Sequence, residues 1–187
     1  MVNDTQVLNN GYPMPSIGLG VYKITDEDME NVVNTAIETG YRAFDTAYFY
    51  GNEVALGKAL QNSGVDREDL FITSKLWNDY QGYDNTIEYF NQSLENLGLD
   101  YIDLFLIHWP CEKDGLYIES YKALEKLYDE GKVKAIGVCN FKQHHLEKLM
   151  EETEVVPQVN QIELHPYFNQ EDVQEFCDNH DTVSYTH

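Results

Sequence analysis

The sequence predicts an α/β protein built on a parallel β-sheet, and three observations support this fold class. Short apolar stretches recur along the chain, and each is followed by a stretch of about 10 to 15 residues that reads as a helix. Several of the apolar stretches show no polar alternation, which is typical of strands covered on both faces. Polar and ionisable residues stand at the carboxyl ends of these stretches, where a parallel α/β barrel places its working groups.

The elements can be justified in order. Gly and Pro occupy turn positions in residues 7–20, which predicts a small β-hairpin and then a first strand at 17–21. The stretch 26–40 begins with acidic residues and ends in Gly40, the pattern of a helix with a favourable first turn and a glycine stop.

The same strand and helix unit then repeats. One helix carries apolar residues at Ile87, Phe90, Leu94 and Leu97, which lie on a single helical face. The stretch 102–109 is apolar almost throughout and predicts a fully buried strand. The six expected pairs, strand then helix, are 17–21 with 26–40, 42–46 with 52–63, 69–77 with 83–98, 102–109 with 119–132, 133–140 with 144–153, and 157–164 with 169–180.

Two architectures accept six such pairs, a doubly wound open sheet and a TIM-type (β/α)8 barrel. An open sheet that binds a dinucleotide would typically carry a glycine fingerprint after its first strand. Here Gly18, Leu19 and Gly20 are followed by Val-Tyr-Lys, so the fingerprint is incomplete. This favours the barrel.

Composition excludes several classes of function. The 187 residues are enough for one domain, and 42% hydrophobic residues indicate a packed core rather than disorder. Twelve Lys and Arg against 33 Asp and Glu give a net charge of −21, which repels phosphate backbones and anionic lipid headgroups. We therefore expect no nucleic acid and no membrane among the partners.

Cysteine usage and the first residues point to the same kind of protein. Cys111, Cys139 and Cys177 are far apart and odd in number, so we expect neither a disulfide framework nor a metal site. The N-terminus lacks the features of a signal peptide, and no run reaches the ~18 apolar residues that a membrane helix needs. A cytoplasmic location is expected.

Four residues at the ends of neighbouring strands form a candidate catalytic group. Asp45 ends the second strand, with Tyr50 in the loop after it, Lys75 ends the third and His108 ends the fourth. Each alone has a structural explanation: a cap, a half-buried aromatic, a surface cation and a core histidine. Together on one rim they favour chemistry, because a buried lysine needs a carboxylate partner.

The four residue types suit the protonation of a carbonyl oxygen. A tyrosine is a poor acid near neutrality, and a nearby ammonium would lower its pKa. Lys75 would polarise Tyr50, Asp45 would hold Lys75 charged, and His108 would orient the carbonyl. A hydride that arrives at the carbonyl carbon creates the charge that such an acid neutralises.

These stretches resemble the aldo-keto reductase family, in particular its short bacterial diketogluconate reductase type. The matching residues are GYRAFDTAYFYGNEVALGKAL, FITSKLW, LFLIHWP, KAIGVCNF and PQVNQIELHPYFNQ, in order along most of the chain. The resemblance implies a (β/α)8 barrel and an oxidoreductase that uses NADPH, or more broadly NAD(P)H, to reduce aldehydes and ketones.

The resemblance also implies roles for individual residues. Tyr50 would be the general acid, supported by Lys75, Asp45 and His108. Residues expected to contact the cofactor are Asn140, Gln161, Cys139 and Asp45, and those expected to contact the substrate are Tyr22, Trp77, Trp109 and His108. Cys139 stands where the family has a serine, so its contact with the carboxamide would be looser.

The chain ends where the family continues through two more strand and helix units. We therefore expect a single incomplete barrel domain over residues 1–187, with about six strand and helix units, an N-terminal hairpin and no partner for the sixth strand on one side. A reading-frame change or premature stop would explain such an end. Open edges favour self-association, Tyr185 is the candidate to stack on the nicotinamide, and a non-catalytic remnant or binding subunit is the alternative to an active reductase.

Overall fold

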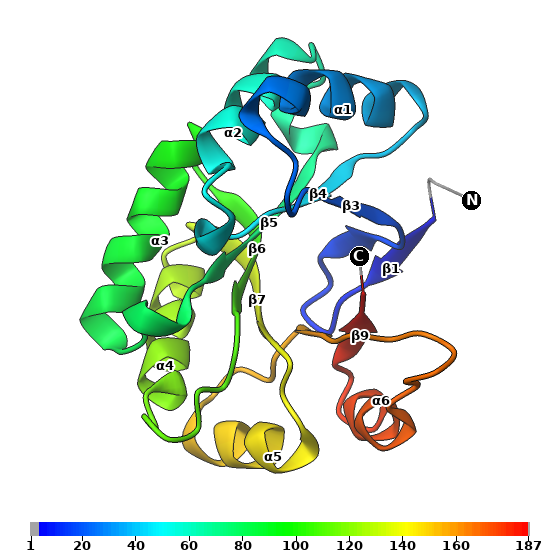
Figure 1. Cartoon of the computed structure of the whole chain (residues 1–187). Helices are drawn as coiled ribbons and strands as arrows, with labels where there is room; N and C mark the ends of the chain where they lie inside the picture. The colour runs from blue at the N-terminus through cyan, green and yellow to red at the C-terminus, as the bar shows by residue number, and fades with distance from the viewer. Residues whose placement is uncertain (1–3, 187) are drawn as a thin grey trace.

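The computed structural model describes residues 4–186, and within that range a sheet of seven parallel strands curls around a core while helices cover its outer face (Figure 1). The strands follow one another in sequence order. They are β3 (Gly18–Gly20), β4 (Ala43–Asp45), β5 (Phe71–Leu76), β6 (Ile102–Ile107), β7 (Val133–Cys139), β8 (Val159–Gln161) and β9 (Val183–Tyr185).

Each of the six expected helices is present. They are α1 (Asp26–Glu38), α2 (Glu53–Asn62), α3 (Tyr83–Leu97), α4 (Tyr117–Asp129), α5 (Gln143–Glu152) and α6 (Glu171–Asp178). Short 3-10 turns lie at Tyr48–Tyr50, Arg67–Asp69 and Asn78–Tyr80. In the part of the chain that the structure describes, no helix is long and apolar enough to cross a lipid bilayer.

Local sequence explains how the helices begin and end. The hydroxyl of Thr25 accepts the backbone N–H of Asp28, and acidic residues fill the first turn of α1, as expected for a capped helix start. The end of α3 is set by Gly98, which adopts a left-handed conformation with φ 65° and donates its N–H back into the last turn.

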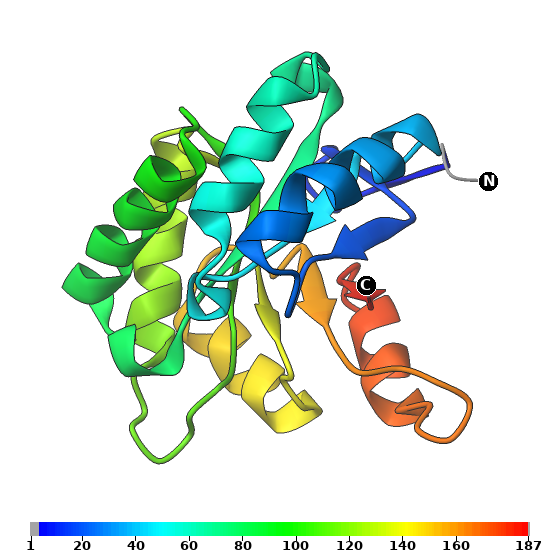
Figure 2. The same ribbon diagram turned by 45° about the horizontal axis from the view of Figure 1, so that its top comes forward.

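The expectation that the sixth strand would lack a partner was wrong. Residues Val183–Tyr185 form β9, which pairs in parallel with β8 in the register Val159 to Val183 and Gln161 to Tyr185. Three residues are too few to show periodicity in the sequence, which is why this strand was missed. The edges of the sheet, as far as it is described, are therefore β3 and β9, which lie near each other in both views (Figure 2).

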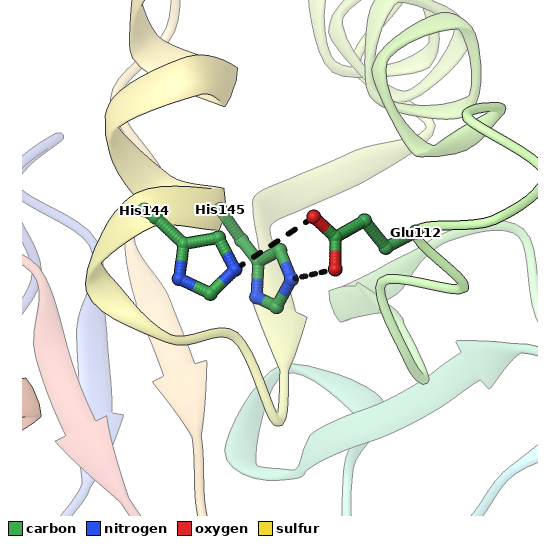
Figure 3. Close-up of side chains that lie close together, drawn as sticks. All are labelled: Glu112, His144 and His145. Carbon is green, nitrogen blue, oxygen red and sulfur yellow. Dashed lines mark ion pairs between the residues drawn. The ribbon is translucent and has the colours of Figure 1, made fainter.

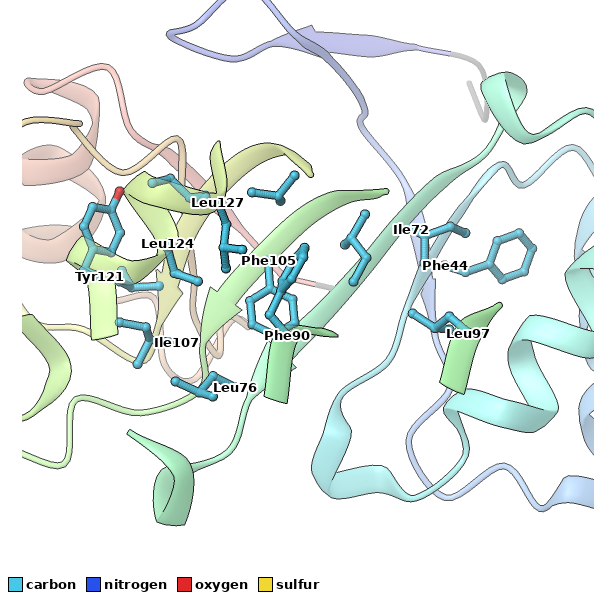
Figure 4. Packing of buried hydrophobic residues seen from close by; sticks show 14 of the residues in the cluster. Phe44, Ile72, Leu76, Phe90, Leu97, Phe105, Ile107, Tyr121, Leu124 and Leu127 are labelled. Atoms are coloured by element: carbon cyan, nitrogen blue, oxygen red, sulfur yellow. The ribbon is translucent and has the colours of Figure 1, made fainter. Parts of the chain in front are cut away.

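Side-chain alternation divides the core into two parts. Between the sheet and the helices, a large cluster packs residues such as Phe44, Phe90 and Phe105 (Figure 4). A smaller cluster fills the inside of the curled sheet. Its residues, among them Ala43 and Leu104, alternate along the strands with those of the large cluster. In β4, Asp45 follows the inward-facing Ala43 by two residues, and in β5, Lys75 follows the inward-facing Phe71 by four. Because side chains alternate along a strand, both Asp45 and Lys75 point into the barrel.

An antiparallel hairpin of β1 (Thr5–Val7) and β2 (Pro13–Pro15) closes the amino-terminal end of the barrel. Leu8 and Met14 are buried in the inner cluster. The side chain of Asn9 bonds the carbonyl of Pro157 at 3.3 Å and accepts from Gln158 at 3.1 Å, so the hairpin is fixed to residues far along the chain. The carboxyl end of the barrel remains for the candidate site.

Candidate active site

Tyr50 is presented by a short turn at the end of β4. The strand ends at Asp45, and residues Tyr48–Tyr50 form a 3-10 turn that Gly51 terminates with φ 70°. Glycine adopts this left-handed conformation without strain, so the chain can enter α2 immediately afterwards. Tyr50 is consequently half-buried at the carboxyl rim of the sheet.

Asp45 and Lys75 form a fully buried ion pair beneath Tyr50. The Lys75 ammonium donates to the Asp45 carboxylate and, at 2.9 Å, to the carbonyl of Thr46. The second carboxylate oxygen of Asp45 accepts from the side-chain amide of Gln161 at 2.7 Å. Burial alone lowers the pKa of Lys75, but the neighbouring Asp45 carboxylate leads a group of interactions that raise it overall. Lys75 therefore remains an ammonium inside the barrel.

Lys75 and His108 approach Tyr50 from two sides. The Lys75 nitrogen lies 3.5 Å from the Tyr50 hydroxyl, at the limit of a hydrogen bond. The ring of His108 meets the Tyr50 ring edge to face, with centroids 5.8 Å apart. The four residues expected to act together therefore converge at one place, although they come from three strands and a turn.

The pKa of Tyr50 moves opposite to the expected direction. Burial raises it above its ordinary value, Lys75 opposes that rise, and Asp45 adds to it, with a net increase. The sequence could not show how deeply the phenol is buried, and desolvation of a phenolate outweighs one neighbouring cation that is itself paired. Tyr50 is therefore held in its protonated form, the form required of a proton donor.

A cavity of about 270 Å³ opens beside these residues. Tyr50, His108, Asn140 and Gln161 contribute to its lining. Asn140 follows β7 in a left-handed conformation, with φ 63°, and donates its side-chain N–H to the carbonyl of His108 at 2.9 Å. Asparagine tolerates this backbone better than most residues. Two amide side chains at a cavity supply both donors and acceptors, which suits the carboxamide of a nicotinamide.

Cys139 and Tyr185 lie below the cavity rather than in its lining. Cys139 is 1% exposed, and its sulfur is 3.8 Å from the side-chain oxygen of Gln161. Burial raises the pKa of the Cys139 thiol well above its usual range, so it stays neutral. Tyr185 is packed in the inner cluster, with its hydroxyl against Gly18 of β3. In this arrangement its ring fills the inside of the sheet between the two edge strands.

Aromatic side chains surround the mouth of the site. The Tyr22 and Tyr50 rings lie 4.8 Å apart, and Trp77 meets His108 edge to face at 5.3 Å. Trp109 is 45% exposed on the same loop as His108. Sequence reasoning missed Phe49, which is half exposed and stacks on Trp77 with centroids 3.8 Å apart. Its position beside Tyr50 in a short turn was the available signal.

A buried polar network, also missed from the sequence, fixes the turn that carries Tyr50. The Asn52 side chain accepts the Thr46 hydroxyl at 2.8 Å and donates to the Val21 carbonyl at 2.9 Å. Glu53, next to it, accepts from Ser74 at 2.6 Å and from Asn96 at 2.9 Å. The residues Asn52 and Glu53 therefore connect the turn to β3, β5 and α3.

Comparisons with known proteins find relatives over most of the chain. A protein-family model described as the Aldo/keto reductase family matches residues 16–186. The chain is 51% identical over 174 residues to 9,11-endoperoxide prostaglandin H2 reductase of Trypanosoma cruzi, which covers 92% of this chain and 61% of that protein. It is 50% identical over 177 residues to glyoxal reductase of Bacillus subtilis, covering 94% and 63% respectively. The chain thus spans less than two thirds of the length of these curated relatives.

Solved structures give the same result. A variant of Gox0644, solved in complex with NADPH, superimposes with a TM-score of 0.94 at 43% sequence identity. The superposition covers 100% of this chain and 68% of that one. The half-barrel described above therefore corresponds to part of a known barrel.

Proposed function

Because the chain belongs to the aldo/keto reductase family, we propose that it reduces aldehydes or ketones to alcohols with NADPH. One observation carries the proposal: the contacts from Asp45 through Lys75 to Tyr50 end at a cavity of about 270 Å³ that is also lined by His108. A protonated phenol beside a cavity is suited to protonate an oxygen on which negative charge develops.

Each residue has a defined role in the proposed reaction. NADPH, when bound, supplies the hydride that adds to the carbonyl carbon. Tyr50 gives its hydroxyl proton to the carbonyl oxygen, while the Lys75 ammonium stabilises the phenolate that remains. His108 orients the carbonyl oxygen toward Tyr50. Asp45 keeps Lys75 charged and in place.

Asn140 and Gln161 are the proposed contacts for the nicotinamide carboxamide. Their amides line the cavity at the same rim as Tyr50. Gln161 also donates to Asp45, so the proposed cofactor contact and the ion pair share one side chain. The sulfur of Cys139 contacts the side-chain oxygen of Gln161. The family has a serine at this position, and the thiol of Cys139 forms weaker hydrogen bonds than a serine hydroxyl does.

The substrate class that we favour is a small aldehyde or dicarbonyl compound. The cavity is small. Tyr22, Trp77 and Trp109 are proposed to contact the substrate from the rim beside Tyr50 and His108, with Phe49 stacked on Trp77. Glyoxal reductase, to which the chain is 50% identical, is named for a substrate of this size. Polar carbonyl compounds with few carbons would be held by His108 and Tyr50 rather than by an extended apolar pocket.

Titration of the chain with NADPH tests the proposal. The sequence has two tryptophans, Trp77 and Trp109, and both lie at the rim, so their fluorescence reports on this site alone. We expect saturable quenching, accompanied by NADPH oxidation when methylglyoxal is added. No quenching up to about 1 mM NADPH would reject the reductase in favour of the non-catalytic remnant or binding subunit.

A further inference from the structure

Outside the candidate active site, three side chains with metal-binding groups meet at the rim of the barrel. Glu112 lies in the loop after β6, and His144 and His145 lie in the first turn of α5 (Figure 3). The distance from His144 Nε2 to one Glu112 oxygen is 4.0 Å, and from His145 Nε2 to the other it is 3.6 Å. The three candidate ligand atoms lie within 4.8 Å of one another.

His145 is the fixed member of this cluster. Its side chain is only 8% exposed, and its Nε2 atom is buried without a hydrogen-bond partner among the described residues. The ring is held by Tyr117 and Phe141, which it meets edge to face. Burial and then the adjacent His144 lower the pKa of His145, and Glu112 acts in the opposite direction. A buried polar atom without a hydrogen-bond partner, directed at a carboxylate and a second imidazole, indicates a binding site for an ion.

We propose that Glu112, His144 and His145 form a binding site for a divalent transition metal ion, with Zn²⁺ as the best match. Two imidazoles and one carboxylate are a frequent ligand set for Zn²⁺, and water can complete the tetrahedron. Bonds of about 2.0–2.1 Å place tetrahedral ligand atoms roughly 3.3 Å apart, so atoms that lie up to 4.8 Å apart need to approach by up to about 1.5 Å. Glu112 and His144 are 69% and 57% exposed and are free to make that movement.

Two features of α5 oppose binding and set its expected strength. The backbone N–H of Lys142 donates to His145 Nδ1 at 3.1 Å, so the proton of the neutral ring is on Nε2. A metal ion on Nε2 displaces that proton to Nδ1, and the bond from Lys142 is then lost. The helix N-terminus and the Lys142 charge also disfavour a cation, whereas Glu112 and the net charge of −21 favour one. We therefore expect micromolar rather than tighter affinity.

The site would join two segments that flank the candidate active site. Glu112 lies in the loop that begins with His108 and Trp109, and α5 follows Asn140. A bound ion would restrain both loops from outside the cavity. This site could not be predicted from the sequence, because the carboxylate and the histidines come from different strand and helix units. The expectation of no metal site rested on spacing within a single segment.

Calorimetry with ZnCl₂ on the tag-free chain tests the proposal. We expect one Zn²⁺ per chain with a micromolar dissociation constant, weakened about 10-fold or more in Glu112→Gln and in His144→Ala. His165→Ala is the matched control, because it removes a surface histidine that lies 3.0 Å from a carboxylate, Glu163, in a pair without a third ligand. It should bind Zn²⁺ as the unaltered chain does.

A second readout tests the role of His145 in the unaltered chain, because replacing His145 would remove its hydrogen bond with the Lys142 backbone N–H at the start of α5. Hydrogen exchange of the Lys142 backbone amide should become faster when Zn²⁺ binds, because that amide loses its acceptor. The proposal is overturned if Zn²⁺ does not bind below about 1 mM, if Glu112→Gln and His144→Ala bind as the unaltered chain does, or if Lys142 exchange is unchanged at saturation.

Discussion

At the scale of single residues, the proposed chemistry depends on the hydroxyl of Tyr50. Replacement by phenylalanine removes the proton and leaves the ring contacts with Tyr22 and His108 in place. We expect Tyr50→Phe to lower kcat for carbonyl reduction by about 100-fold or more, as is typical for loss of a general acid, with NADPH binding unchanged. Steady-state kinetics and fluorescence titration measure the two effects.

The matched control for this variant is Tyr48→Phe. Tyr48 lies in the same turn, but its ring packs against Tyr80 and Tyr89. Its hydroxyl should be dispensable for turnover. Near-normal kcat in Tyr50→Phe, or an equal loss in Tyr48→Phe, would remove Tyr50 from its proposed role as the acid.

Lys75 provides a prediction about pH. Its positive charge lowers the pKa of Tyr50 against the larger effect of burial. In Lys75→Met that opposing contribution is absent, so the pKa of Tyr50 rises further and the alkaline fall in reductase activity moves to higher pH. The pH dependence of kcat measures this shift, and an unmoved alkaline limb would show that Lys75 and Tyr50 are not coupled.

Removal of Lys75 also takes away the ammonium that faces the buried Asp45 carboxylate, at a cost of about 3–5 kcal/mol. The double variant Asp45→Asn with Lys75→Met avoids this cost, because both charges are absent. It should recover much of the stability in urea denaturation. It also loses the ionic support of Tyr50, so its turnover should remain low.

The residues of the candidate group could be placed on one rim from the sequence, because each follows an apolar stretch that ends at the same side of a parallel sheet. Their ionisation could not be predicted, since it depends on burial and on partners such as Gln161, which is distant in sequence from Asp45. Phe49 was missed for a similar reason. Its exposure and its stacking on Trp77 follow from a turn that no periodicity describes.

At the scale of elements, the turn between β4 and α2 is held by the side chain of Asn52. In Asn52→Ala the Thr46 hydroxyl and the Val21 carbonyl each lose a buried partner. We expect the free energy of unfolding to fall by about 1–3 kcal/mol, and kcat to fall more than KM rises, because Tyr50 is displaced. Asn31→Ala, at an exposed position of α1, should change neither.

Urea denaturation and steady-state kinetics on the two variants give the comparison. A stable Asn52→Ala variant with normal kcat would show that the turn holds its shape without this network. Loss of stability with normal kcat in the folded fraction would limit Asn52 to a structural role.

Helices were easier to predict than strands in this chain. Local signals mark the boundaries of α1 and α3, namely Thr25 before α1 and Gly98 after α3. Strands such as β8 and β9 have three residues each, and their existence is decided by the neighbour that they pair with. The six helices could therefore be predicted from local signals, whereas β9 could not.

At the scale of the whole molecule, the sheet leaves β3 and β9 as its edges among the described residues. Unpaired strand edges favour association between copies, whereas a net charge of −21 opposes it. We propose that the chain forms a single incomplete barrel domain and self-associates through these edges. Salt should then strengthen the association, because it screens the repulsion while edge pairing and apolar contact remain.

Sedimentation velocity at about 0.05 M and 0.5 M NaCl measures this effect. The dimer fraction should rise with salt at fixed protein concentration. A fraction that falls with salt would indicate an interface built on ion pairs instead, and a monomer at both concentrations of salt would exclude association through the edges.

The hairpin at the amino-terminal end of the barrel also bears on how the protein is made. Its anchor Asn9 bonds Pro157 and Gln158, which the ribosome adds 148 and 149 residues later. Contacts this far apart in sequence form late and slowly. Leu8 and Met14 therefore remain uncovered on the nascent polypeptide until residues 157 and 158 have been added, which makes this hairpin one of the later segments to find its place and a natural point for chaperone engagement.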